Sequence, residues 1–473
     1  VNSIVTMRRK ISIIIVLLTA LASAAFGQSA QLKHNLSRAV SLYKFGHCIE
    51  ARTELLSLRS KLSPVTDKAT IERVDYYLAL CDAELKMADA DSRLKRFLAT
   101  YQGSIFTNEV QFTLATRAFM FEDTATAEAE LLKVNYKNLS PQQRDRYDLR
   151  MGYSRFLSGD YNEAEQFFKR IADNSDYAEH ATYYQSYIAY TRGKYDVARE
   201  GFNSLLKSPQ YRDLMPFYGM QIDFKEGKYR NVVEGGDALI STTTPEQAMQ
   251  IERIMAESWF QLDDYTRAEE YMSRYKAHGG KMGRVENYIM GYSLHRRTLY
   301  DKALPYLREA CGADDLLTQN ASYHLADCYL REGDKTNAMH SFAMASNAQF
   351  DPSIAEDALF NYGKLQYELG GGRFNEAINV LTRYVEQYPR SERVSDAHTL
   401  LIAAYYNSKN YAQAYEAIKR LPNPDNEVLL ALQKVAYFNG LEAYTEGELD
   451  RAEASFQESM AAGKNAKYNA LAS

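Results

Sequence analysis

Residues 158–171 read SGDYNEAEQFFKRI, and residues 192–205 read RGKYDVAREGFNSL. The two stretches, 34 residues apart, place a Gly, a Tyr, an Ala and a Phe at matching positions. A repeat period of about 20 to 50 residues is typical of chains that stack copies of one small structural unit. The Ala of this phrase therefore serves as an anchor for aligning the rest of the chain.

The anchor position recurs along nearly the whole chain at intervals of 34–39 residues. A Gly stands five residues before it in seven of twelve phrases, and an aromatic residue stands three before it in seven. A large apolar residue stands four after it in eleven, with Gly236 as the exception. The sequence therefore predicts twelve repeats. Their anchors are Ala51, Ala90, Ala127, Ala164, Ala198, Val232, Ala268, Ala303, Ala338, Ala377, Ala414 and Ala452.

Each repeat is predicted to form two helices joined by a tight turn. In residues 142–157, the large residues Tyr147, Met151 and Phe156 keep the spacing of one helix face. The Gly that follows suits a helix end, because Gly enters the left-handed conformation without a steric penalty. The small Ala lets the two helices cross closely. Since one pair cannot bury its apolar face alone, the pairs are expected to stack into an all-α fold, an α-solenoid.

These phrases resemble the tetratricopeptide repeat (TPR), and the resemblance covers about residues 31–473. It implies a right-handed superhelix whose first helices line a concave groove. Departures from the pattern at Leu85, Val232, Gly236 and residues 370–372 are expected to mark places where the superhelix bends or opens. The family pattern also has a small residue in the first helix and often a closing Pro, seen here at Ala115, Gly152, Ala256, Gly291, Ala326 and Gly440, and at Pro209, Pro352 and Pro389.

The N-terminal residues show the pattern of a secretory signal peptide. A positive stretch at 7–10 precedes an apolar run at 11–21, and Ala25 and Gly27 supply small residues before a cleavage position. We expect residues 1–27 to be removed and residues 28–473 to form an exported solenoid; an uncleaved membrane anchor is the alternative. No Cys follows the cleavage position, so a lipid anchor is not indicated.

The C-terminal residues match the start of another repeat. Tyr468, Leu471 and Ala472 have the spacing of a further first helix. An open end of a solenoid exposes its stacking face unless a polar cap covers it. We therefore expect repeats to continue beyond Ser473; a fraying end is the alternative.

Composition and motifs argue against nucleic-acid binding and against catalysis. The 473 residues have a net charge of −5, whereas binding to phosphates needs a basic face. No glycine-rich phosphate loop, paired-histidine metalloprotease motif or serine nucleophile elbow is present. We therefore expect no enzymatic activity, no cofactor and no metal. His295 and His324, on first helices of consecutive repeats, could approach each other, but isolated polar positions are the favoured interpretation.

The cysteines permit two disulfides in an oxidising compartment. Cys311 and Cys328 lie one repeat apart, on helices expected to pack together, and Cys48 and Cys81 are similarly placed. Cys is also a common small buried residue in helices, and this is the favoured interpretation.

The concave groove is where binding is expected. Carried over from the family by register, the residues 15, 11 and 8 positions before each anchor face the groove, and aromatic residues dominate there. Tyr offers a rigid apolar face and one polar tip, which suits extended peptides and sugars. The alternative is that many of these rings fill gaps between adjacent first helices. The predicted groove residues are Tyr153, Phe156, Tyr183, Tyr187, Tyr190, Phe217, Phe224, Tyr288, Tyr292 and Tyr323, with Phe112, Phe119, Phe260, Tyr437 and Tyr444 at equivalent positions.

The predicted function is a protein–protein interaction scaffold of the bacterial cell envelope. We expect it in the periplasm or at the outer membrane, with membrane association only through its partners. Groove cations are few, at Arg253, Arg296 and Arg331, and lack companion Asn residues, so recognition of a terminal carboxylate is not supported. The alternative is a glycan or cell-wall binding module that uses the groove tyrosines. The single Trp, Trp259, disfavours it, because that position is expected to be buried.

Overall fold

The computed structural model of the protein describes residues 30–419 and 426–473. The predicted signal peptide and its cleavage after Gly27 lie outside these residues. Every regular element in the described part is a helix, and that part contains no strand. Contacts divide the chain into an N-terminal unit that ends at Met215 and a C-terminal unit that begins at Pro216. Each unit is an all-α solenoid, which confirms the predicted fold class.

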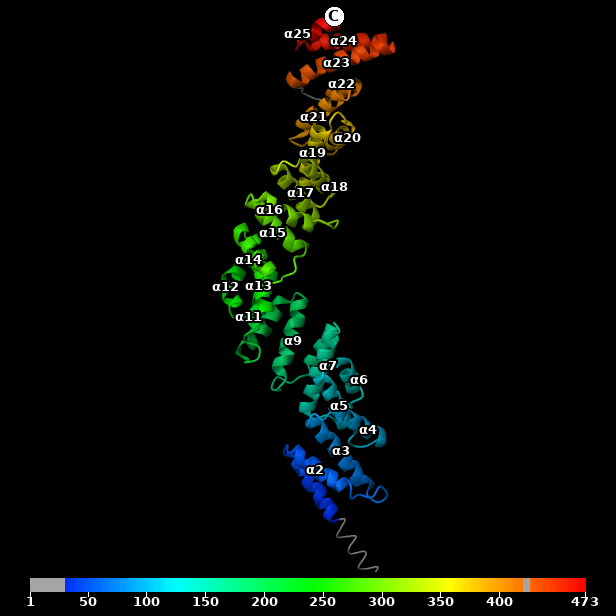
Figure 1. Ribbon diagram of the computed structural model, residues 1–473, viewed down its shortest axis with the longest axis vertical. Coiled ribbons are helices and arrows are strands. Elements are labelled where there is room, and N and C mark those ends of the chain that lie inside the picture. The colour runs from blue at the N-terminus through cyan, green and yellow to red at the C-terminus, as the bar shows by residue number, and fades with distance from the viewer. Residues whose placement is uncertain (1–29, 420–425) are drawn as a thin grey trace, which may run out of the picture. The chain divides into compact units, whose positions relative to one another are not determined.

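In the described residues of the N-terminal unit, first and second helices of the repeats alternate along the chain (Figure 1). After a first helix over residues 30–44, the elements are α2 (Cys48–Arg59), α3 (Lys68–Glu84), α4 (Ala90–Thr100), α5 (Thr107–Met120), α6 (Thr124–Leu131), the 3-10 helix η1 (Tyr136–Asn138), α7 (Pro141–Leu157), α8 (Tyr161–Phe168), α9 (Ala178–Thr191), α10 (Tyr195–Ser204) and the 3-10 helix η2 (Leu205–Lys207).

The same alternation continues through the C-terminal unit, and α11 begins at the boundary residue. Over the described residues of the two units this gives the twelve helix pairs that were predicted, followed by one further helix. The elements are α11 (Met215–Lys225), α12 (Tyr229–Ile240), α13 (Pro245–Gln261), α14 (Tyr265–Ala277), α15 (Arg284–Arg296), α16 (Tyr300–Ala310), α17 (Leu316–Arg331), α18 (Lys335–Asn347), α19 (Pro352–Leu369), α20 (Asn375–Gln387), α21 (Val394–Asn407), α22 (Tyr411–Lys419), α23 (Asn426–Glu446), α24 (Leu449–Ala462) and α25 (Ala466–Ala472).

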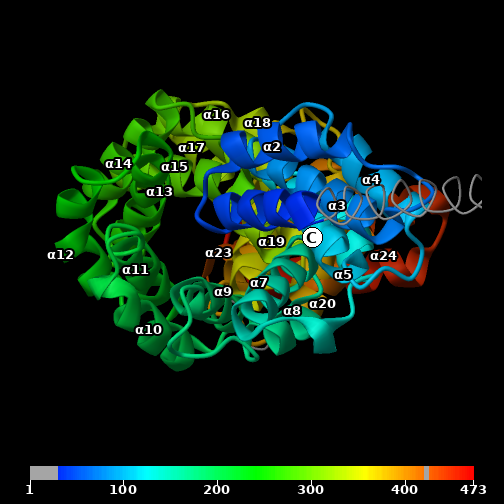
Figure 2. The same ribbon diagram turned by 90° about the horizontal axis from the view of Figure 1, so that it is seen from below.

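First and second helices take different sides of the C-terminal unit. Figure 2 shows the second helices α12, α14 and α16 on the outside of the first helices α11, α13 and α15. Consecutive first helices α13, α15 and α17 also contact one another directly. Side chains on the first helices that do not pack against second helices therefore face the inner side of this unit or the seam between two first helices. None of the helices in the described residues combines the length and apolarity that a membrane crossing requires.

The anchor residues form the centre of each repeat, as predicted. All twelve are buried, with exposed fractions between 0 and 2%. The large residue four positions later is also buried in ten repeats, and only Phe456 in the last repeat is half-buried. In ten repeats this arrangement puts two buried side chains one helical turn apart on the second helix.

The small residue of the first helix lies where the two helices of a repeat cross. A Cβ atom added to Gly152 would lie 2.6 Å from Cε1 of Phe168. One added to Gly291 would lie 2.9 Å from the backbone nitrogen of Leu307. Real Cβ contacts are longer than this, so these positions have room for hydrogen only. The predicted close crossing is therefore confirmed in both units.

The turn between the two helices uses a left-handed residue. Gly159 has a φ of 81° and Gly193 a φ of 71°, in line with the predicted role of the hairpin Gly. Other hairpins in the described residues place a different residue type in this conformation, namely Lys86, Glu122, Asp263, Thr298 and Lys409. The turn geometry is thus kept where the sequence has no Gly.

Two of the positions that depart from the repeat pattern have a local structural explanation. In repeat two, Lys86 rather than Leu85 takes the left-handed conformation, with a φ of 53°, so the turn is shifted by one residue. In repeat six, a Cβ atom at Gly236 would lie 2.1 Å from Sδ of Met255 on α13. Met255 from the next repeat therefore fills the space that a large residue fills elsewhere. Val232 is fully buried like the other anchors.

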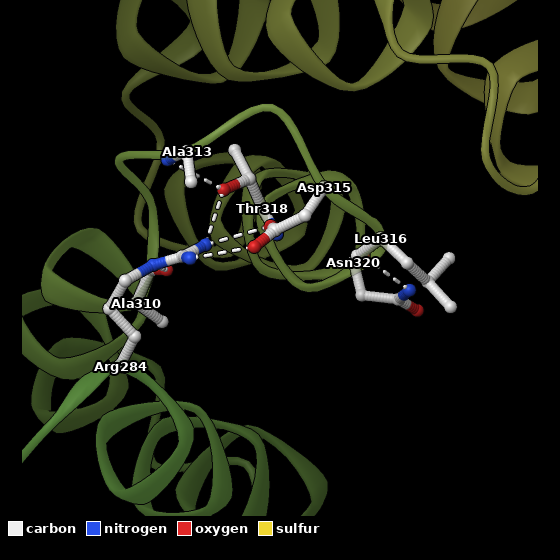
Figure 3. Close-up of polar contacts among 7 residues, drawn as sticks. All are labelled: Arg284, Ala310, Ala313, Asp315, Leu316, Thr318 and Asn320. Atoms are coloured by element: carbon white, nitrogen blue, oxygen red, sulfur yellow. Dashed lines mark hydrogen bonds and ion pairs between the residues drawn. The ribbon is translucent and has the colours of Figure 1, made fainter.

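Neighbouring repeats are also held together by charged side chains. Arg284, at the start of α15, binds both carboxylate oxygens of Asp315 at 2.7 and 2.8 Å (Figure 3). Its Nε donates to the carbonyl oxygen of Ala310 at 2.9 Å, and its Nη2 donates to Thr318 Oγ1 at 2.7 Å. The Arg284 guanidinium and the backbone N–H of Thr318 hold the pKa of Asp315 well below its usual range. This cluster fixes the turn between α16 and α17 against α15.

Candidate functional site

Aromatic rings on α5, α7 and α9 form a continuous row in the N-terminal unit. The ring of Phe119 lies 5.5 Å from that of Tyr153, and Tyr153 lies 5.5 Å from Tyr184, measured between centroids. Phe156 is 5.1 Å from Tyr184 and 5.4 Å from Tyr187. We call these five residues the N-terminal aromatic row. Each contact joins first helices of neighbouring repeats, so the row crosses two seams.

A second row joins α13, α15 and α17 in the C-terminal unit. Phe260 lies 6.1 Å from Tyr288 and 5.5 Å from Tyr292, and Tyr292 lies 4.6 Å from His324. His324 contacts Tyr323 at 5.4 Å. We call these five residues the C-terminal aromatic row. In both rows, rings on neighbouring first helices contact each other, although the rows lie in separate units and on different repeats.

The predicted groove residues are part of the packing between first helices while keeping partial exposure. Among the ten, only Phe217 is buried, with 8% exposure, and the other nine are half-buried. The row contacts show that rings do fill gaps between adjacent first helices, which was the alternative interpretation. Tyr183 also stacks on Tyr211 at 5.0 Å. Phe224 contacts Tyr229 of its own repeat at 5.9 Å. The prediction that these residues bind a partner stays a prediction.

The hydroxyl of one row residue, Tyr323, has a specific partner on the next first helix. The Tyr323 hydroxyl donates to Asp357 Oδ2 at 2.8 Å, across to α19. Burial, followed by this hydrogen bond, raises the pKa of Tyr323. Burial also raises the pKa of Tyr288 and of Tyr184. These hydroxyls therefore stay protonated and do not act as bases near neutral pH.

The two histidines singled out by the sequence meet at the end of the C-terminal aromatic row. Their ring centroids are 5.1 Å apart, and His295 Nε2 is 2.8 Å from Asp327 Oδ2. Burial lowers the pKa of His324 to about 4, and the nearby His295 adds to this effect. Within residues 30–419 and 426–473, no group of three His, Cys, Asp or Glu side chains is placed to hold a metal ion.

The groove cations are engaged with neighbouring side chains. Arg253 lies 3.5 Å from Glu257 and 3.7 Å from Glu286, and Arg331 lies 3.5 Å from Asp327. Arg296 stacks over Tyr292 at 5.9 Å. Arg253 and Arg331 therefore lie next to carboxylates of the chain itself.

Trp259 is half-buried rather than buried, and the Arg267 guanidinium covers its ring at 4.3 Å. One face of the indole is therefore unavailable for stacking against a sugar.

Some residues at the rows were not predicted from the sequence. Tyr184 stands one position from Tyr183, outside the three register positions, yet its ring connects α7 to α9. Asp327 and Asp357 are the partners of His295 and Tyr323. A carboxylate on the first helix of the next repeat, about 32–34 residues further along, is the signal that could have found them.

A separate hollow of about 1270 Å³ lies in the N-terminal unit. Its lining comes from the first helix over residues 30–44, the start of α3 and the loop 101–106, and includes Lys33, Lys44, Arg73 and Glu72. None of the ten predicted groove residues lines it. The repeat pattern gives no sign of this hollow, because it is formed by a loop and not by the recurring phrase.

Comparison with protein families identifies two parts of the chain. A model described as tetratricopeptide repeat matches residues 290–352, which run from within α15 through α16, α17 and α18 to the first residue of α19. A model described as outer membrane lipoprotein matches residues 353–447. No curated protein matches the chain.

Several solved structures share the helical-repeat character at low identity. The Cut9–Hcn1 hetero-tetramer of the APC/C is 14% identical, with 93% of this chain and 88% of that chain covered and a TM-score of 0.26. The C-terminal part of a TPR protein from Cytophaga hutchinsonii is 15% identical, covering 54% and 98%, with a TM-score of 0.32. A TPR protein from Parabacteroides merdae is 13% identical, covering 70% and 98%, with a TM-score of 0.30. TM-scores this low support no inference about binding or activity.

Proposed function

We propose that this chain, in which residues 290–352 match a tetratricopeptide-repeat model, is a non-enzymatic scaffold that binds extended protein segments along its first helices. Tetratricopeptide repeats indicate a protein-interaction scaffold in general. The observation that carries the choice of surface is the presence of half-buried aromatic rows on successive first helices in both units. Aromatic side chains contribute large contact areas at low conformational-entropy cost, and they are enriched among residues that dominate binding energy.

We also propose that the protein works in the bacterial cell envelope, in the periplasm or at the outer membrane, as part of an envelope protein complex. Two features support this location. The outer membrane lipoprotein model matches residues 353–447, and residues 1–27 have the composition of a secretory signal peptide. Cell fractionation of the native protein tests the location: recovery in the cytoplasmic fraction contradicts it.

The binding surface is tested on α9, which carries Tyr183, Tyr187 and Tyr190. Changing all three to Ala removes the rings, and we expect capture of protein partners from envelope extracts to fall sharply. The Tyr183–Tyr211 stack and the Phe156–Tyr187 contact are lost in the same variant, so some stability is lost as well. Circular dichroism at the assay temperature shows whether the fold is retained.

A second set of variants separates packing from binding. The same three positions changed to Phe keep the ring contacts and lose only the hydroxyls. On the outer helix α16, Tyr306→Ala removes a half-buried tyrosine whose hydroxyl accepts a hydrogen bond from Lys276, and this variant serves as the matched control. We expect Tyr306→Ala to retain capture. If the triple Ala variant folds and captures every partner, α9 is not the binding surface. If it unfolds, the three rings are core residues. Loss of binding to purified glycan instead would favour a glycan-binding module.

A further inference from the structure

Two arginines on one face of α7 lie beside the N-terminal aromatic row. Arg146 and Arg150 are four residues apart, so their side chains leave the same side of the helix, and Tyr153 of the row stands three residues after Arg150. Both arginine side chains are half-buried. Neither stands at one of the three register positions that were expected to face the groove. The row is therefore accompanied by two positive charges that the repeat pattern did not predict.

Neutral groups on the neighbouring first helices hold the two guanidiniums in place. Cζ of Arg150 lies 5.4 Å from the ring centroid of Phe119, a member of the row on α5, and its Nη1 donates to Thr116 Oγ1 on the same helix. Cζ of Arg146 lies 6.0 Å from the ring centroid of Tyr177, and its Nε donates to the Tyr177 hydroxyl at 2.8 Å. Cation–π contacts and hydrogen bonds to hydroxyls orient a guanidinium without neutralising its charge.

The two charges have no counter-charge in the chain. Within residues 30–419 and 426–473, no carboxylate forms an ion pair with Arg146 or Arg150. Nε and Nη2 of Arg150 and the two terminal nitrogens of Arg146 make no hydrogen bond there and are not buried, so they are open to a ligand. Burial lowers the pKa of Arg150 to about 10, and the positive charge of Arg146 adds to this effect. Because removing a charge from water is costly unless it is paired, a bound anion offsets this cost.

We propose that Arg146 and Arg150 bind an Asp or Glu side chain of a partner segment, while the N-terminal aromatic row binds the apolar residues next to it. The inference rests on the proposed scaffold function and names the class of partner, an extended segment that combines acidic and apolar residues. A guanidinium presents its N–H donors in a planar fork that matches the two oxygens of a carboxylate. Charge complementarity makes an anion the preferred occupant over a neutral or cationic side chain. A phosphate group shares this chemistry, and the experiment separates the two.

The experiment starts from a library of short random peptides displayed on phage, which is selected on the immobilised full chain. We expect the selected peptides to be enriched in Asp or Glu next to apolar residues. One selected peptide is then synthesised with a fluorescent label, with its acidic residue kept, changed to Gln or replaced by phosphoserine. Fluorescence anisotropy should show an affinity at least about tenfold lower for the Gln form, because it leaves both guanidiniums without a counter-charge.

Variants of α7 locate the effect on the chain. Arg150→Gln should bind the acidic peptide at least about tenfold more weakly than the parent chain and the Gln form with unchanged affinity. Arg155→Gln is the matched control, because it removes the same charge from the same helix, but Arg155 already lies 2.8 Å from Glu128. We expect this control to bind both peptides as the parent chain does. Circular dichroism checks the fold, and if Arg150→Gln fails to fold, Arg146→Gln gives the same comparison from the other guanidinium.

Three results overturn the proposal and leave the scaffold function standing. The first is a set of selected peptides without acidic enrichment, or equal affinity for the acidic and Gln forms. The second is an equal loss of affinity in Arg150→Gln and Arg155→Gln, which would assign the effect to overall charge and not to a site. The third is a phosphoserine form that binds at least about tenfold more tightly than the acidic form, which would make this a phosphopeptide site. A chain that selects no peptide at all contradicts the scaffold function itself, and this inference with it.

Discussion

Replacing Gly291 by Ala tests whether the close crossing of helices determines the stability of a repeat. A Cβ atom at this position would lie 2.9 Å from the backbone nitrogen of Leu307 and 2.8 Å from its Cγ. The backbone of α16 cannot turn aside as a flexible side chain can, so α15 and α16 must move apart. Overpacking of this kind costs about 2–3 kcal/mol. Ala is a better helix former than Gly by about 1 kcal/mol, so the net loss is about 1–2 kcal/mol.

Gly235→Ala is the matched control for this substitution. Gly235 also lies inside a helix, α12, but a Cβ atom added there meets nothing within 4 Å. Gly235→Ala should raise the free energy of unfolding by about 1 kcal/mol, because Ala is the better helix former and meets no neighbouring atom. The difference between the two variants therefore isolates the crossing, and we expect it to be about 2–3 kcal/mol.

The assay combines urea unfolding, followed by circular dichroism, with hydrogen exchange read by mass spectrometry. Because a solenoid is stabilised by each repeat and its neighbours, the faster exchange in Gly291→Ala should be confined to α13 through α18. If Gly291→Ala is as stable as the parent chain, or matches Gly235→Ala, the crossing is not tight enough to limit residue size and the reasoning fails.

Further predictions concern single buried residues. Ala164→Leu should overpack repeat four by about 1–3 kcal/mol, with protection lost near repeats three to five; uniform loss along the chain in hydrogen exchange contradicts this. Burial raises the pKa of Asp148 to about 6, and its Oδ1 has no hydrogen-bond partner. The folded state therefore binds this proton more tightly than the unfolded state, and stability rises as pH falls through about 6. Asp148→Asn should be more stable than the parent above that pH in urea titrations, and the advantage should shrink in acid. His324 has the opposite effect on stability. Burial lowers its pKa from 6.5 to about 4, so the folded state becomes less stable as the pH drops across that window. His324→Gln should flatten the pH dependence of the unfolding midpoint there.

The sequence predicted the recurring features of the fold because they depend on one repeat at a time. The burial of the anchors and the position of the helix pairs follow from a phrase that each repeat contains in full. The filling of the space at Gly236 could not be predicted, because the side chain that enters it is Met255 of the next repeat. The left-handed conformation of Lys86 could not be predicted for a local reason: a non-Gly residue one position from the expected site takes the turn conformation.

The candidate site was predicted less completely for the same physical reason. Register placed Tyr153 and Tyr292 on first helices, where the structure finds them. It left open whether the rings face the groove or contact the next first helix, because such contacts depend on the angle between repeats. Nor did it find Asp327 as the partner of His295, since nothing in one repeat requires a carboxylate on the next.

The non-Gly residues in left-handed turns lower the free energy of unfolding, and substitution by Gly can restore it. Five hairpins in the described residues place Lys86, Glu122, Asp263, Thr298 or Lys409 in a conformation that costs an L-residue about 1–2 kcal/mol relative to Gly. Each is a site where a change to Gly relieves local strain without altering the turn. In repeats two, three, seven, eight and eleven, which hold these five residues, an otherwise damaging core mutation can therefore be compensated by a single change in the turn. A chain organised in this way can tolerate more destabilising substitutions elsewhere than its overall stability would suggest.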